Sequence, residues 1–146
     1  MNASSALHAP SPAGERATFF CPACWEQIPE SATTCPACGI DIARFLAETD
    51  YGAQLINTLR HPDARRRLMA AWILGERREH RAISALRGLA LTETRDVYLA
   101  KAAVDALAKI GAADAIDTLQ LARARHPARL VRHAAAAALS SRTART

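Results

Sequence analysis

All four cysteines of the chain lie in one short stretch, and their spacing indicates metal binding. Cys21 and Cys24 form one Cys-x-x-Cys pair, and Cys35 and Cys38 form a second pair after a short spacer. Two such turns can bring four thiolates into a tetrahedron around one zinc ion. Each turn reads CPAC, and its proline fixes the backbone angle φ at about −65°, which helps both sulfur atoms to face inward. We therefore expect Cys21, Cys24, Cys35 and Cys38 to bind one structural Zn²⁺.

Three other uses of these cysteines have to be weighed against zinc. A redox Cys-x-x-Cys pair usually opens a helix that follows a strand, whereas TFF and IPESATT flank these turns. Disulfide bonds need an oxidising compartment, and residues 1–16 lack the basic start and apolar core of a secretory signal. Four thiolates in a tetrahedron also suit iron. Zinc is favoured because four-cysteine sites in so short a segment are usually structural zinc sites.

The segment around the cysteines is too small to fold without help. Chains below roughly 40 residues usually need a metal, disulfides or a partner. The second CPAC turn is followed by Gly39, which can adopt a left-handed backbone conformation, but the first is followed by Trp25. The CPxC…CPxCG pattern resembles bacterial zinc ribbons. That resemblance implies a small β-type metal module and no particular activity.

The rest of the chain repeats itself with a period of about 33 residues, which is typical of helical repeat proteins. The shift aligns small and large apolar residues: Ala70 with Ala103 and then Ala135, Leu74 with Leu107 and then Leu139, Ala82 with Ala115, Ile83 with Ile116, and Leu86 with Leu119. A small residue followed one turn later by a large one suits close packing of helices. Pro62 and Pro127 are expected in the first turn of a helix, and Gly75 and Gly111 near the turn to the next helix.

Three segments carry a family resemblance, namely RRLMAAWILGERREHRAISAL, LAKAAVDALAKIGAADAIDTL and VRHAAAAALSS. They resemble HEAT-like repeats of the type known from phycobilisome lyases, over residues 49–141. The resemblance implies an α-solenoid whose second helices line a concave binding face. The predicted fold class is mostly α, a short HEAT-like α-solenoid with a small N-terminal β-type zinc ribbon.

The predicted organisation has four parts: a disordered lead-in at 1–16, a zinc ribbon at 17–45, HEAT-like repeats at 46–141 and a flexible tail at 142–146. No apolar run approaches the roughly 20 residues that a membrane span needs, so we expect a cytoplasmic protein.

The ribbon joins the repeats without a Gly, Ser or Pro spacer. Ile42, Phe45 and Leu46 are expected to pack against the first repeat helix, on Leu55, Ile56 and Leu59. The ribbon would then cap an end of the solenoid that is otherwise exposed.

Scaffolding of a protein partner is the function that this resemblance favours, because most HEAT-like stacks bind other macromolecules. An enzyme of the lyase or deoxyhypusine hydroxylase type is the third choice. Those hydroxylases carry His-Glu pairs where this chain has His133-Ala134, Leu68-Met69 and Lys101-Ala102. Without carboxylates at these positions a di-iron centre cannot form, and His133 is interpreted as a surface residue.

Nucleic-acid binding is the second choice, because positive charge gathers in the repeats. Residues 60–146 hold 17 of the 19 Lys and Arg residues and 8 of the 14 acidic residues. The basic clusters are Arg65 to Arg67, and Arg77 and Arg78 with His80 and Arg81. Arginines on such helices usually pair with neighbouring acids, and Asp63 is expected to pair with Arg67 at i+4. A phosphate-binding groove would need continuous cations, yet the expected outward positions of the second helices are mixed: Ser84, Arg87, Asp117 and Gln120. Trp72 is expected in the core, so stacking aromatics are not predicted.

The last predicted helix, VRHAAAAALSS, is not followed by a matching second helix. Leu130 and Leu139, with alanines such as Ala135 and Ala138 between them, are expected to form a partly exposed strip. Such a strip could support self-association through the C-terminal helix or accept a helix from a partner.

Overall fold

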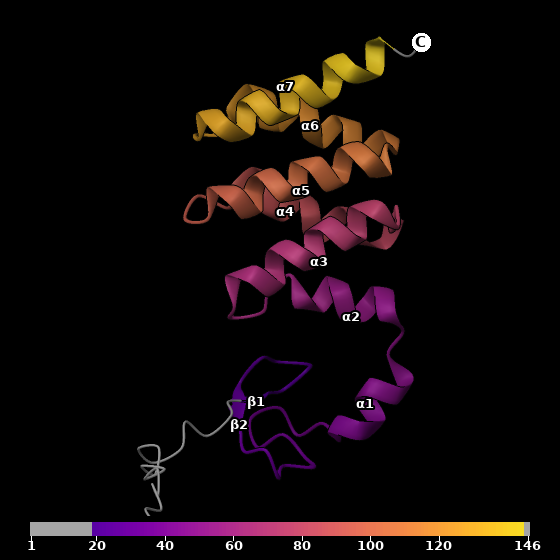
Figure 1. Cartoon of the computed structure of the whole chain (residues 1–146), viewed down its shortest axis with the longest axis vertical. Coiled ribbons are helices and arrows are strands. Elements are labelled where there is room, and N and C mark those ends of the chain that lie inside the picture. The colour runs from indigo at the N-terminus through magenta and orange to yellow at the C-terminus, as the bar shows by residue number, and fades with distance from the viewer. Residues whose placement is uncertain (1–18, 145–146) are drawn as a thin grey trace, which may run out of the picture.

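The computed structural model describes residues 19–144, which form a small two-stranded ribbon and a stack of helices (Figure 1). The disordered lead-in predicted for residues 1–16 lies outside the described part of the chain. The elements are β1 (Phe19–Phe20), β2 (Gln27–Ile28), α1 (Ile42–Glu48), α2 (Tyr51–Thr58), α3 (Ala64–Glu76), the 3₁₀ helix η1 (His80–Ala82), α4 (Ile83–Thr92), α5 (Val97–Ile110), α6 (Ala113–Arg125) and α7 (Arg129–Thr143). The predicted fold class is confirmed.

The ribbon is held by very few backbone and apolar contacts. Strands β1 and β2 pair antiparallel, with Phe19 opposite Ile28. Its buried residues are Cys21, Ile28 and Cys35, and only small or single apolar side chains pack around them. Two of the three buried residues are cysteines, so the interior of the ribbon is largely the site that the sulfur atoms share.

The helices form two layers. In the first layer α5 packs between α3 and α7, and in the second layer α4 packs against α6. Each second-layer helix also packs against the first-layer helix that follows it in the chain, namely α2 on α3, α4 on α5 and α6 on α7 (Figure 1). The core lies between the layers and runs the length of the stack.

The positions that the repeat period aligns are the core of the stack. The fully or almost fully buried members are Ala70, Ala103, Ala135, Leu74, Leu107, Ala82, Ala115, Leu86 and Leu119. Leu139, Ile83 and Ile116 are partly buried against the same core. Alanine at the first of these positions lets α3, α5 and α7 approach closely.

Local signals set the helix ends, with one correction to expectation. Asp63 caps α3 and Asp96 caps α5 through side-chain hydrogen bonds to backbone N–H groups. Gly111 ends α5 in the left-handed conformation, at φ +70°. The prolines Pro62 and Pro127 precede the capping residues Asp63 and Ala128 instead of entering the first helical turn.

Gly75 lies in the last turn of α3, near the turn to the next helix, as expected. A Cβ atom there would come within 2.8 Å of Ala106 Cα, so glycine is required by the close approach of α3 and α5. Helix α7 extends through Thr143, so positions 142 and 143 of the expected flexible tail are helical.

The two His-Pro turns are built alike. His126 Nδ1 accepts a hydrogen bond from the Ala128 backbone N–H at 3.0 Å, so its Nε2 carries the hydrogen and donates to the Glu93 carbonyl oxygen at 3.1 Å. Arg132 donates to the His126 carbonyl oxygen at 2.7 Å. The side chain of His126 thereby ties its own turn to the preceding one.

The same arrangement recurs at the first His-Pro turn. His61 Nδ1 accepts from the Asp63 N–H at 2.9 Å, and Arg67 donates to the His61 carbonyl oxygen at 3.1 Å. Arg67 also pairs with Asp96 at 3.4 Å, in the turn before α5. The expected pair between Asp63 and Arg67 is therefore wrong, because Asp63 caps the helix and Arg67 is used between turns.

Candidate metal centre and interaction surfaces

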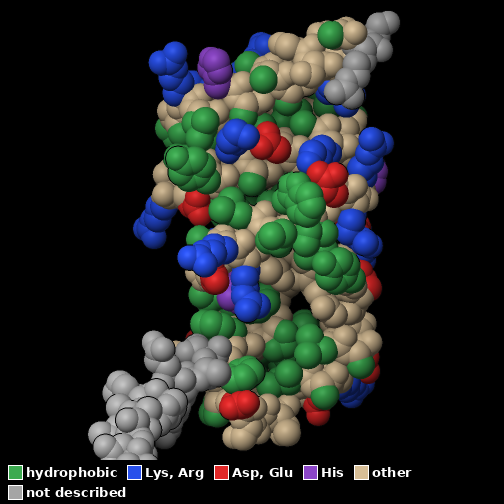
Figure 2. Space-filling model, in the orientation of Figure 1, with side chains coloured by type: hydrophobic (Ala, Val, Ile, Leu, Met, Phe, Trp, Pro, Cys, Tyr) green, Lys and Arg blue, Asp and Glu red, His purple; other side chains and the backbone are tan. Residues whose placement is uncertain are grey.

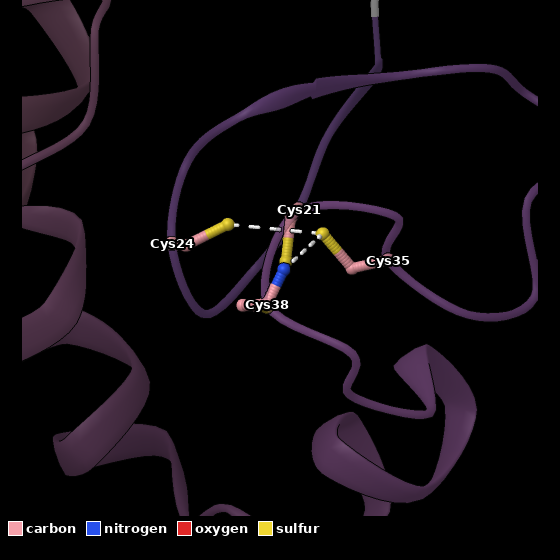
Figure 3. A group of neighbouring side chains, drawn as sticks. All are labelled: Cys21, Cys24, Cys35 and Cys38. Carbon is pink, nitrogen blue, oxygen red and sulfur yellow. Dashed lines mark hydrogen bonds between the residues drawn. The ribbon is translucent and has the colours of Figure 1, made fainter.

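The two CPAC turns bring the four cysteines together. The first turn, residues 21–24, follows β1, and the second, residues 35–38, lies between β2 and α1. Figure 3 shows the four cysteines gathered around one small space between the two turns. Cys21 and Cys35 are buried, whereas Cys24 and Cys38 lie at the surface.

The sulfur positions fit one tetrahedral metal ion. All four Sγ atoms lie within 4.8 Å of one another, with Cys21 and Cys38 at 3.6 Å and Cys24 and Cys35 at 3.8 Å. Four Zn–S bonds of about 2.3 Å would place sulfurs about 3.8 Å apart at a tetrahedron's edges. A disulfide needs sulfur atoms about 2.05 Å apart, and all four cysteines are free thiols. The donor set therefore fits a metal better than a disulfide.

The thiols oppose one another's ionisation, which a cation would relieve. The Cys38 backbone N–H donates to Cys35 Sγ at 3.5 Å and lowers the pKa of the Cys35 thiol to about 6. At Cys24 the Glu26 N–H also acts to lower the pKa, but desolvation and the other thiols outweigh it and raise the pKa to about 12. A divalent ion would stabilise all four thiolates at once.

Trp25 stands where a CPxCG ribbon has glycine, and it keeps the backbone conformation of that glycine. Its φ is +63°, close to the +77° of Gly39 after the second turn. A left-handed conformation costs a residue other than glycine roughly 1–3 kcal/mol. Contacts of the indole with the helical stack offset that cost.

Those contacts join the ribbon to the stack. The Trp25 indole N–H donates to the Asn57 carbonyl oxygen at 2.9 Å. The Asn57 side-chain amide donates in return to the carbonyl oxygens of Pro22 and Ala23, in the first CPAC turn. The cysteine cluster and the C-terminal end of α2 are thus linked through reciprocal hydrogen bonds.

His61 completes this junction. Its ring lies edge to face against Trp25, with ring centroids 4.5 Å apart, and against Phe20 at 5.3 Å. Burial lowers the pKa of the His61 imidazole, and the nearby Arg66 guanidinium adds to the effect. In the next His-Pro turn the ring of His126 contacts the preceding repeat, so the ribbon takes the place of a preceding repeat at His61.

The expectation that the ribbon packs through Ile42, Phe45 and Leu46 is not met. Ile42 joins the small core of the ribbon, and Leu46 is 46% exposed. Helix α1 buries none of its residues completely. The contacts that cap the stack come from the first CPAC turn instead. The sequence signal for this docking was Trp25, which stands at a position where such ribbons have glycine.

A second feature lies on the outer side of the first-layer helices, where large apolar side chains face solvent. Trp72 on α3 is 55% exposed, Met69 is 56% exposed, and Tyr98 on α5 is 68% exposed. The expectation that Trp72 is a core residue is therefore wrong, because alanine and leucine fill the interior at that level. Figure 2 shows hydrophobic side chains gathered on this face, with lysine and arginine around them.

The two predicted basic clusters are only partly free. Arg67 is held by Asp96, and Arg81 pairs with Asp50 at 2.8 Å and with Glu79 at 2.9 Å. The hydrogen bonds from Arg81 hold the pKa of the Asp50 carboxyl well below its usual range. Arg77 lies over the ring of Tyr51, 5.3 Å from its centroid.

The remaining cations of the two clusters are exposed. Arg65, Arg66 and Arg78 have no acidic partner in the part of the chain that the structure describes. On the second-layer helices Ser84, Arg87, Asp117 and Gln120 are exposed, as expected. That face carries both charge signs and polar groups.

The C-terminal helix meets the expected apolar strip only in part, because Leu130, Ala138 and Leu139 are partly exposed but Ala135 is not. Ala135 is fully buried and Val131 is buried beside it, so this side of α7 belongs to the core of the stack. Leu130 is 40% exposed, and His133 is exposed on the outer side of the helix. A glutamate at Ala135 would disrupt the stack itself, so it cannot serve as a test of docking.

Comparison with known protein families identifies the stack. HEAT repeats match residues 52–140, which is more than half of the chain, so the chain belongs to the HEAT repeat family. No curated protein and no solved structure matches it. HEAT repeats often mediate protein interactions and are generally non-catalytic. Among residues 19–144, no helix combines the length and apolar character that a membrane span requires.

Proposed function

We propose that the chain is a non-enzymatic adaptor, in which a zinc ribbon caps a HEAT stack that binds a protein partner. The observation that carries the proposal is the outer face of α3 and α5, where Met69, Trp72 and Tyr98 are more than half exposed. Exposed aromatic and methionine side chains are enriched in protein interfaces and supply much of their binding energy.

Zinc has a structural role in this proposal. Cys21, Cys24, Cys35 and Cys38 would hold one Zn²⁺ and fill all of its coordination positions, which leaves none for a substrate. The ion would fix the first CPAC turn, and this turn carries Trp25 onto the stack. A cytoplasmic location belongs to the same proposal, because free thiols persist in a reducing compartment.

The finer family resemblance remains a prediction from the sequence. The repeat pattern resembles that of phycobilisome-lyase-type proteins, but the family match extends to HEAT repeats in general. His133, at the position of the hydroxylase-type metal ligands, is exposed and is followed by Ala134. Neither residue supports a catalytic role.

Nucleic-acid binding is the second candidate, and one observation favours it. Arg65, Arg66, Arg95 and Arg129 lie at or just before the N-terminal ends of first-layer helices and have no acidic partner within residues 19–144. An edge of this kind could contact phosphates. The exposed Trp72 and Tyr98 also supply rings on which bases could stack.

Site-directed crosslinking in the native cell tests the proposal. A photoreactive amino acid replaces Tyr98 on the outer face, and the matched control replaces Gln120, which is exposed on the second-layer helix α6. We expect one discrete protein adduct from position 98 and none from position 120. Adducts that nuclease removes, or equal protein adducts from both positions, would contradict an adaptor that uses this face.

A further inference from the structure

A groove crosses the outer face of the first-layer helices. It has a volume of about 930 Å³ and is lined by α3, α5 and α7 and by the turns that follow α3 and α5. Trp72 lies at one side of it, and Arg78 and Arg142 also line it. The groove is distinct from the ribbon and from the concave face that HEAT stacks usually use.

Three alanines of α7 line the groove, together with Ser141 and Arg142 of the same helix. Ala134, Ala137 and Ala138 stand at positions i, i+3 and i+4, so they share one side of the helix. Small side chains in this arrangement leave a flat surface that another helix can approach closely. Trp72, 55% exposed, would give such a helix a large apolar anchor.

The charges of the groove are unbalanced. Its two carboxylates are already paired, Glu76 with Lys109 and Asp105 with Lys101, the latter at 2.7 Å. Arg78 and Arg142 have no acidic partner within the described chain. Two free guanidinium groups beside an apolar surface complement a ligand that is apolar on one side and acidic at its edge.

We infer that this groove binds an amphipathic α-helix of a partner protein, with an apolar side against Trp72 and the alanines and with carboxylates toward Arg78 and Arg142. The inference rests on the adaptor function proposed above and names the partner's chemistry. A nucleic acid fits the groove less well, because Trp72 is its single aromatic ring and Glu76 and Asp105 would face the phosphates.

The test uses the full chain with zinc present and a labelled helical peptide of about 15 residues, built from leucine on one side and glutamate at the edges. Fluorescence anisotropy measures its affinity against a peptide with lysine in place of glutamate and against a scrambled sequence. We expect the glutamate peptide to bind at least about tenfold more tightly than either. Equal binding of all three peptides would overturn the inference.

Two variants with the same change of charge locate the binding. Arg78→Glu with Arg142→Glu reverses the groove, whereas Arg87→Glu with Arg125→Glu reverses exposed arginines on the second-layer helices α4 and α6. We expect the groove variant to lose about tenfold or more in affinity for the glutamate peptide and to gain affinity for the lysine peptide. The control should stay within about twofold. Equal losses would mean that net charge, and not the groove, binds the peptide.

Further measurements test whether a nucleic acid or a second copy of the chain occupies the groove, and whether the adaptor function depends on it. Trp72→Ala should weaken the glutamate peptide about thirtyfold without loss of helix content by circular dichroism, because the side chain is exposed. A single-stranded oligonucleotide that displaces the peptide, or dimers in light scattering that Trp72→Ala abolishes, would overturn the inference. If the Arg78 and Arg142 variant still gives the protein adduct from position 98, the adaptor function stands and the groove is not its helix-binding site.

Discussion

The indole N–H of Trp25 donates a hydrogen bond to the carbonyl oxygen of Asn57 at 2.9 Å, across the junction between the ribbon and the first helix of the stack. The two residues are 32 positions apart, about one repeat period. The bond is returned from the Asn57 side chain to the first CPAC turn. The residue that follows a proposed metal ligand by one position is therefore also the docking residue of the module.

Replacing Trp25 with glycine should separate metal binding from docking. Glycine accepts φ of +63° without strain, so the CPAC turn should keep its shape and its zinc. Loss of the ring contact with His61 and of the bond to Asn57 should leave the ribbon mobile on the stack. Elemental analysis should give unchanged zinc, and limited proteolysis should cleave faster between the ribbon and α2. Slower or unchanged cleavage would show that the ring does not hold the junction.

Metal removal should affect the ribbon before the repeats. We expect one zinc per chain, and Cys35→Ser should abolish binding because it removes a buried ligand. Most helix content should survive, since the buried core of the repeats is separate from that of the ribbon. A chain with Trp72→Phe has Trp25 as its only tryptophan, so a chelator should shift its fluorescence to longer wavelength. Purified protein without zinc or iron would contradict the metal site.

Two of the helical glycines, Gly75 and Gly88, form a matched pair for testing the packing of α3 on α5. Gly75→Ala places Cβ 2.8 Å from Ala106 Cα, so the helices must separate, and we expect a loss of about 1–3 kcal/mol in the free energy of unfolding. At Gly88 a Cβ meets nothing within 4 Å, and alanine there should stabilise α4 by up to about 1 kcal/mol. Chemical denaturation measures both. Equal effects of the two substitutions would mean that the close approach of α3 and α5 does not require glycine at position 75.

Acid should weaken the junction through His61. Its pKa in the folded chain is below the ordinary value of about 6.5, so the unfolded state binds the proton more readily. Stability from the neutral ring is complete above about pH 6.5 and declines as pH falls through the folded pKa. The unfolding midpoint of the wild type should therefore drop more between about pH 7.5 and pH 5.5 than that of His61→Asn, which keeps an acceptor for the Asp63 N–H.

Zinc release also accompanies acidification, so a metal indicator has to follow each unfolding measurement. If both proteins lose zinc at the same pH and still differ in their unfolding midpoints, the difference belongs to the imidazole. Identical pH profiles of the wild type and His61→Asn would show that the imidazole of His61 does not stabilise the junction.

Much of the repeat core could be predicted because it depends on periodicity. Ala70, Ala103 and Ala135 were aligned by a simple shift, and all three are buried. Cys-x-x-Cys spacing likewise restricts where the thiols can go, and the four sulfur atoms do converge. Patterns of this kind are local in the sequence, so neighbouring residues suffice to recognise them.

Contacts between distant residues were beyond such patterns. Trp72 lies among apolar residues and was expected inside, but its orientation depends on how far α3 rotates against α5, which the sequence of one helix does not define. Arg67 was expected to pair with Asp63 one turn away and instead reaches Asp96 in the following turn. The docking of Trp25 on His61 required knowledge of which surface of the ribbon meets the stack.

The ribbon occupies the place of a preceding repeat at the first His-Pro turn, and this makes it a transferable part. Its docking requires an asparagine at the C-terminal end of the preceding helix and a histidine four positions later, supplied here by Asn57 and His61. A helical repeat protein given these two side chains at its first turn should accept residues 19–49 as a ready-made N-terminal module. Such a graft would let chelation loosen the end of an artificial solenoid on demand.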